Sequence, residues 1–84
     1  MKTMTCRQMG GPCDLAFQGN SADDVIHAQD AHLKEVVAAG DTSHADALKD
    51  MRGRWKNPLK GMGWYRQTKK TFAALPEDAP VSRE

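Results

Sequence analysis

Residues 5–17, TCRQMGGPCDLAF, hold both cysteines of the 84-residue chain, one on each side of a glycine- and proline-rich turn. Glycine tolerates positive φ, and proline removes a backbone donor, so Gly10-Gly11-Pro12 favours a tight connection between two strands. The flanking residues 2–7 and 13–18 have the short alternating pattern of strands. The sequence therefore predicts an N-terminal β-hairpin.

The register of this hairpin decides where the two thiols point. If the loop centres on Met9-Gly10, Cys6 lies directly opposite Cys13. Because strand side chains alternate between faces, both thiols then share one face with three larger apolar side chains, Met4, Leu15 and Phe17. Both cysteines are thus predicted to face whatever element covers the hairpin.

The next segment has the start and stop signals of a helix. Ser21 and Asp24 are spaced as a capping box, and Gly40 suits a helix C-terminus. One histidine, His32, falls within an apolar row at helical spacing, made of Val25, Ala28, His32 and Val36. His27 falls in a polar row instead. The pattern therefore predicts that His32 faces the hairpin and that His27 faces solvent.

Two further helices are predicted in the second half. Ser43 and Asp46 again have capping-box spacing, and the helix must end before Asn57-Pro58, because the residue before proline avoids helical geometry. Its apolar row is His44, Leu48, Met51 and Trp55. A glycine-rich connector, PLKGMG, is expected to lead to a last helix whose inward row is Trp64, Thr68, Phe72 and Leu75.

Two thiols and two imidazoles are thereby directed at one interior. Cys6, Cys13 and His32 converge there, and His44 completes a Cys₂His₂ set if the second helix returns to the hairpin. Such a set suits zinc, and directly opposed strand residues, with Cβ atoms ~4.5–5.5 Å apart, can place two sulfurs on one ion. Two alternatives stay open: the cysteines are small buried hydrophobic residues beside a hydrogen-bonded core histidine, or they form a cross-strand disulfide.

The N-terminal half, MTCRQMGGPCDLAF followed by SADDVIHAQDAHLKEV, resembles a family of short bacterial and archaeal proteins of unknown function described as predicted small metal-binding proteins. The matching positions are Cys6, Gly10, Cys13, Phe17 and His32. The resemblance covers roughly residues 1–39, and longer bacterial relatives are similar over RGRWKNP and GMGWYR as well. It implies metal binding. Many short members have a second histidine where this chain has Val37, so His44 is assigned here by geometry and not by motif.

A closed four-ligand site is structural, whereas an open site could hold a reactive water. No general base is evident beside the predicted ligands: Asp14 is expected on the opposite strand face, and Asp30 and Glu35 lie off the His32 row. The cysteines are not in the Cys-x-x-Cys arrangement of redox enzymes. The chain is therefore not expected to be an enzyme.

The charge is unevenly distributed. The net charge is +1, but residues 1–50 contain four basic and eight acidic side chains, whereas residues 51–84 contain eight basic and three acidic ones. Between residues 51 and 75 there are seven Lys or Arg and no acid, interleaved with Trp55, Trp64 and Tyr65. The alternative function is thus a metal-free binding module that contacts nucleic acid or an acidic protein. A homodimer joining the two halves is equally compatible.

The sequence as a whole predicts one α+β domain over residues 1–75, with a hairpin over 2–18 and helices over about 22–39, 43–56 and 64–75. Residues 76–84, PEDAPVSRE, are expected to be a flexible tail. No apolar run approaches the ~20 residues of a membrane span. The N-terminus lacks the apolar centre of a secretory signal, so we expect a cytoplasmic location, where thiols stay reduced.

Overall fold

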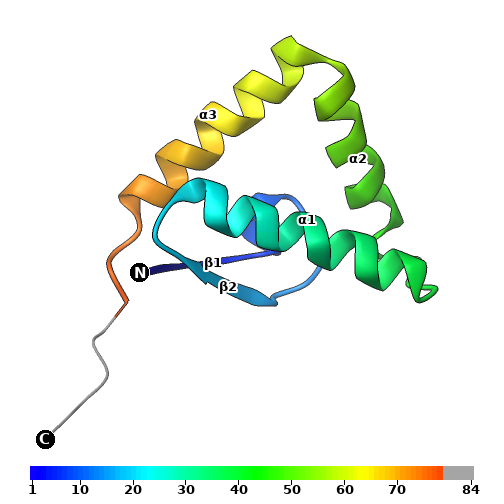
Figure 1. Cartoon of the computed structure of the whole chain (residues 1–84), viewed down its shortest axis with the longest axis horizontal. Coiled ribbons are helices and arrows are strands. Elements are labelled where there is room, and N and C mark those ends of the chain that lie inside the picture. Colours follow the sequence, from blue (N-terminus) through cyan, green and yellow to red (C-terminus); the bar gives the residue numbers. More distant parts are fainter. Residues whose placement is uncertain (79–84) are drawn as a thin grey trace, which may run out of the picture.

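A computed structural model of the chain describes residues 1–78 and has the predicted α+β arrangement (Figure 1). A two-stranded antiparallel hairpin is followed by three helices. The elements are β1 (Lys2–Thr5), a 3₁₀ turn η1 (Arg7–Met9), β2 (Ala16–Gly19), α1 (Ala22–Ala38), α2 (Ala45–Lys56) and α3 (Pro58–Ala74). The predicted fold class is confirmed. Residues 79–84 of the predicted tail lie outside the described residues.

The predicted hairpin register is wrong by two residues. Met4 pairs with Phe17, not with Leu15, and neither cysteine lies in a strand, because β1 ends at Thr5 and β2 begins only at Ala16. Cys6 instead begins η1, so the connection is a ten-residue loop rather than a tight turn. An even shift keeps the faces, and Met4 is fully buried as predicted, but Leu15 leaves the sheet and is 49% exposed.

Helix α1 is bounded by the predicted signals. Ser21 and Asp24 form a complete capping box, with each side chain accepting from the other residue's backbone amide. At the other end, Gly40 has a φ of 101°, and the amides of Gly40 and Asp41 donate to the carbonyls of Val37 and Val36. These two bonds are the Schellman motif, which reverses the chain toward α2.

The starts of the other two helices differ from the prediction. Ser43 does not cap α2, which begins after His44 without a side-chain cap. Helix α3 begins at Pro58, six residues earlier than expected, because the side chain of Asn57 accepts from the Lys60 amide and proline is favourable at the first helical position. The expected glycine-rich connector is therefore helical, and Asn57 alone separates α2 from α3.

The core consists of two small clusters. The first joins the hairpin to the start of α1 and the end of α3, and its buried members are Met4, Met9, Ala22, Val25 and Phe72. The second joins the loop to the end of α1 and to α2, and its buried members are Cys6, Leu33, Ala47, Leu48 and Met51. Phe17, which is half-buried, packs against both clusters. Both core clusters therefore depend on the hairpin.

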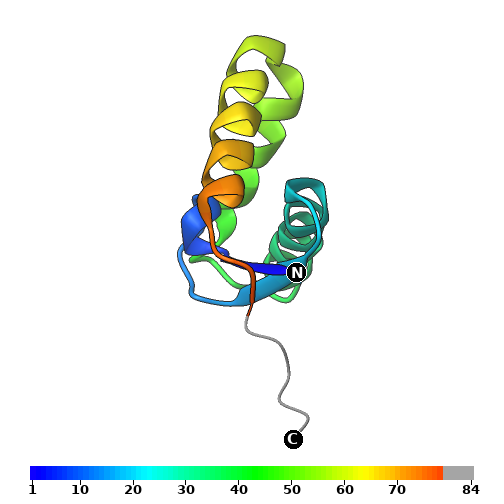
Figure 2. The same cartoon turned by 90° about the vertical axis from the view of Figure 1, so that its left-hand side faces the viewer.

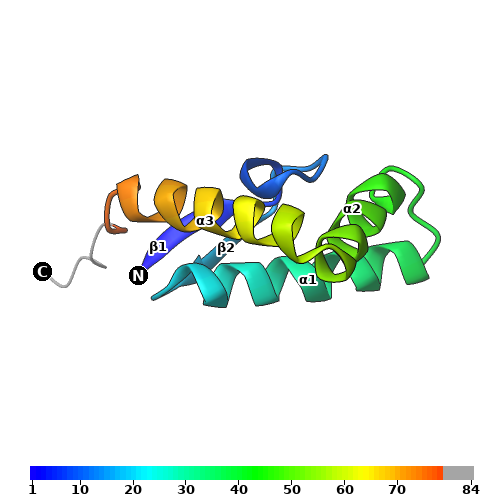
Figure 3. The same cartoon turned by 90° about the horizontal axis from the view of Figure 1, so that it is seen from above.

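The helices do not form a parallel bundle. Helix α1 lies along the hairpin, while α2 and α3 form an arm that rises from it, so α1 and the arm diverge in side view (Figure 2). Seen from above, α1 lies along one edge of the molecule, and the loop that carries η1 lies along the other (Figure 3). Within residues 1–78, no helix combines the length and hydropathy needed to span a membrane.

Residues directly after α3 return to the hairpin. The amide of Asp78 donates to the Met1 carbonyl at 2.8 Å, and the Asp78 carboxylate accepts from Thr3 and Gln18. Glu77 pairs with the N-terminal ammonium at 2.9 Å. The chain therefore stays attached to both strands as far as residue 78.

Candidate metal centre

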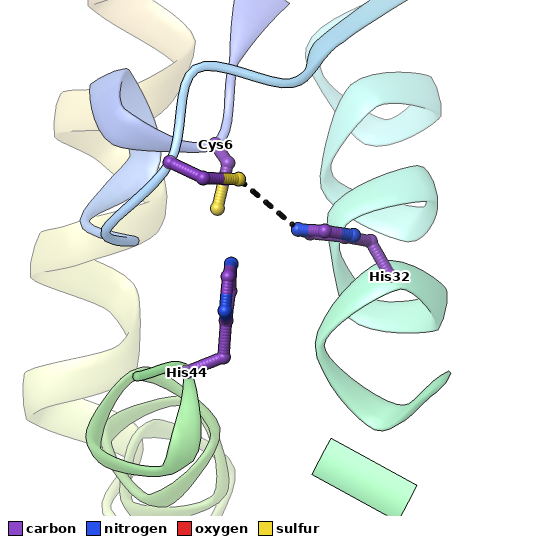
Figure 4. A group of neighbouring side chains, drawn as sticks. Cys6, His32 and His44 are labelled. Carbon is purple, nitrogen blue, oxygen red and sulfur yellow. Dashed lines mark hydrogen bonds between the residues drawn. The ribbon is translucent and has the colours of Figure 1, made fainter. Parts of the chain in front are cut away.

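The structure brings together the four residues that the sequence singled out. One ligand atom from each of Cys6, Cys13, His32 and His44 lies within 4.8 Å of all the others. They come from four places: the start of η1, the loop before β2, the middle of α1 and the residue preceding α2. In Figure 4 the side chains of Cys6, His32 and His44 point toward one another from separate elements.

The separations are close to those of a tetrahedral zinc site. With Zn–S near ~2.3 Å and Zn–N near ~2.0 Å, two ligand atoms on one ion are roughly 3.3–3.8 Å apart. The Cys13 sulfur and His32 Nε2 already lie at 3.4 Å, and since no pair is farther apart than 4.8 Å, the closure required is at most about 1–1.5 Å. Small side-chain rotations are therefore sufficient to form a tetrahedral site.

Cys6 is the most firmly positioned of the four candidate ligands. It is fully buried, and its carbonyl accepts from the amides of Met9 and Gly11 and from the side chain of Gln29. Gln29 is 2% exposed and also approaches the Cys6 sulfur, at 3.8 Å. A Cβ at Gly11 would overlap that sulfur, so the loop can pass behind Cys6 only as glycine.

His44 is oriented for metal binding by its surroundings. Its Nδ1 lies 3.0 Å from the Asp41 carboxylate, and its Nε2 is buried with no hydrogen-bond partner among residues 1–78. The other Asp41 oxygen accepts from the amide and hydroxyl of Ser43 and from the His44 amide. A carboxylate that fixes one ring nitrogen while the other is directed at an ion is the usual outer partner of a metal-binding histidine.

His32 completes the cluster from α1. Its ring stands edge-on to His44, with the ring centroids 4.9 Å apart, and it also contacts Phe17. Burial, reinforced by the positive charge of a protonated His44, lowers the pKa of His32 below its ordinary value. The neutral imidazole is the form that binds a metal, so this environment favours a ligand.

The two thiols differ in acidity. Burial raises the pKa of Cys6. Burial also acts to raise the pKa of Cys13, but the Leu15 backbone amide and the adjacent His44 ring outweigh it, so the net pKa is lowered. The Cys13 sulfur, followed by Asp41, in turn raises the pKa of His44, acting on Nε2 by proximity and not through a well-formed hydrogen bond. Cys13 and His44 thus each favour the ionised form of the other.

The structure brings the four predicted residues together although the predicted register is wrong. Cys6 and Cys13 both lie in the loop between the strands. The conformation of this loop brings their sulfur atoms together, and strand pairing does not. Both thiols are free, so the cross-strand disulfide is absent from the structure. His27 is exposed, as predicted, and Asp14 points to solvent, where it pairs with Arg7.

Two supporting residues were missed from the sequence. Gln29 falls between Val25 and Leu33 in a row that is otherwise apolar, and a lone polar residue there is a signal for a buried hydrogen bond. Asp41 stands three residues before His44, directly after the helix-ending glycine. That spacing suits a turn in which a carboxylate contacts nearby backbone amides.

No protein-family model matches the chain, and neither a curated protein nor a solved structure matches it significantly. The resemblance to predicted small metal-binding proteins accordingly stays a prediction.

Proposed function

We propose that the chain binds one zinc-like divalent ion through Cys6, Cys13, His32 and His44. The observation that carries this proposal is the buried Nε2 of His44, which has no hydrogen-bond partner among the described residues. Leaving such an atom unpaired costs about 1–3 kcal/mol. A metal ion held between this nitrogen, His32 and two sulfurs would remove that cost.

The proposed role of the ion is structural. Four protein ligands fill a tetrahedral shell and leave no position for water or substrate, so we propose no catalytic activity. The proposed ligands join the loop, α1 and the residue before α2, which also meet in a small cluster of five buried residues. In a domain with so small a core, the free energy of metal binding becomes free energy of folding.

Zinc is the first choice among the metals. Thiolate and imidazole ligands in a tetrahedral set suit zinc, and the same ligands accept copper or iron. A site with two free thiols requires a reducing compartment, which fits the expected cytoplasmic location. Membership of the predicted small metal-binding proteins would agree with this assignment.

The test is to purify the chain without an affinity tag or chelator, and to measure the metal bound per chain together with reactive thiols. We expect about one zinc per chain, with both thiols protected until a chelator is added. His44→Ala should lose the metal, and His27→Ala, which removes the exposed histidine of α1, should keep it. A folded, metal-free protein with two reactive thiols and no response to added zinc would refute the proposal.

A further inference from the structure

A groove separate from the metal centre lies between α1 and the α2–α3 arm. It has a volume of about 490 Å³. Its lining is mainly apolar and aromatic and includes Ile26, Met51, Trp55, Met62, Trp64 and Tyr65. None of its lining residues is a proposed metal ligand. The groove is therefore not part of the proposed metal site.

The apolar surface continues out of the groove onto the corner where α2 meets α3. Trp55 and Met62 line the groove and are 75% and 57% exposed, and Leu59 between them is 85% exposed. The prediction that Trp55 faces the core is therefore wrong. No described element covers this surface, which is typical of an interaction site.

Opposite charges lie on the two walls of the groove. Asp23 and Asp30 come from α1, whose four acids outnumber its single lysine. Arg54 comes from α2, and the arm contains seven basic side chains and no acid between residues 51 and 75. The Arg54 guanidinium stacks on Trp64, 3.9 Å from the ring centroid, and forms no ion pair within residues 1–78. It is thus a partly buried cation available to an acidic group.

We propose that a second copy of this chain occupies the groove and forms a two-fold symmetric dimer. In such an interface, any pair of residues that meets once meets again with the roles of the copies exchanged. A surface with acids on one wall, bases on the other and an apolar floor is then complementary to itself. The Asp30 wall of each copy faces the Arg54 arm of the other, and the two Trp55–Leu59–Met62 corners cover each other.

The same charges disfavour the other occupants. A nucleic acid following the basic arm would bring its phosphates against Asp23 and Asp30, and an acidic protein segment would meet the same repulsion. The chain's net charge of +1 leaves little overall repulsion between two copies. The proposal does not rest on metal binding.

The test is a charge exchange read out by sedimentation equilibrium of the full chain. Asp30→Lys and Arg54→Glu, each alone, place like charges against each other and should raise the dimer dissociation constant at least about tenfold. An equimolar mixture of the two variants should restore association, because both contacts are then between opposite charges. Lys70→Glu, at an exposed site of α3 outside the groove, is the matched control and should dimerise like the original chain.

A substitution at an exposed position distinguishes weaker association from loss of the fold. Leu59→Ser changes a side chain that is 85% exposed, so circular dichroism should be unchanged while association weakens. A chain that stays monomeric at all concentrations, or a mixture that associates no better than its components, would overturn the proposal. So would a mixed-sequence single-stranded DNA probe that binds the monomer and is released by Arg54→Glu.

Discussion

The sharpest prediction concerns Asp41→Asn, a change of one atom outside the ligand set. The Asp41 oxygen that accepts from Ser43 and from the His44 amide should remain the amide oxygen, since three donors converge on it. The new NH₂ group then faces His44 Nδ1, which must become an acceptor. The ring proton moves to Nε2, the atom that is directed at the cluster. Metal binding must expel this proton or turn the ring.

Loss of such a supporting carboxylate typically weakens metal affinity by about 10–100-fold, or about 1.4–2.7 kcal/mol. With metal in excess over both dissociation constants, that difference becomes a difference in stability. In a domain of this size it corresponds to a melting temperature lower by about 6–20 °C for the metal-bound variant.

The assay is a competition titration of zinc against a chromophoric chelator, followed by thermal unfolding of the zinc-loaded proteins. Asp30→Asn is the matched control, because it is the same chemical change on α1, where the carboxylate pairs with Lys34. Because Asp30 also lines the proposed dimer groove, all variants are compared at concentrations at which they are monomeric. If Asp41→Asn bound zinc as tightly as the original chain and as the control, Asp41 would not orient His44, and the reasoning from the unpaired Nε2 would fail.

Three more predictions follow from the same geometry. Gly11→Ala should displace the Cys6 sulfur and weaken zinc binding by at least about tenfold, measured by the same competition titration. An unchanged circular dichroism spectrum would show that the loss is not caused by misfolding. Because burial raises the pKa of Cys6, its thiol carries a proton at neutral pH, so zinc binding should release protons and should weaken as pH falls. Calorimetry in buffers of different ionisation enthalpy measures this proton release. A binding enthalpy that did not depend on the buffer would contradict the prediction. Leu33→Ala, fully buried in the second cluster, should cost about 2–5 kcal/mol in urea unfolding. Leu59→Ala at the exposed corner should change stability by less than about 0.5 kcal/mol when both proteins are compared at concentrations at which they are monomeric.

Local rules predicted most of what they govern. The capping box at Ser21 and the glycine stop at Gly40 are confirmed, because each is decided by hydrogen bonds within a few residues. The direction of His32 follows from helical spacing, whereas His44 precedes α2 and its ring is held in place by Asp41. The four proposed ligands were therefore found although no short motif joins them.

The wrong predictions concern features that depend on more than the spacing of neighbouring residues in the sequence. The observed strand register differs from the predicted one because a 3₁₀ turn begins directly after Cys6, which leaves both strands shorter than predicted. Asn57-Pro58 ends one helix, as predicted, but it also starts the next. Trp55 continues the apolar row of α2, but α1 has diverged from the arm at that point, so nothing among the described residues covers it.

The core is divided into two clusters that share Phe17, so one part of the chain can unfold while the other stays folded. The proposed metal centre adjoins the second cluster through Cys6, whereas α3 contributes Phe72 to the first. Local unfolding often follows such units. Amide protons of α2 should therefore exchange through a partial opening when the ion is removed, while β1 and the end of α3 stay protected. Binding of the ion would merge two separately exchanging halves into one cooperative unit.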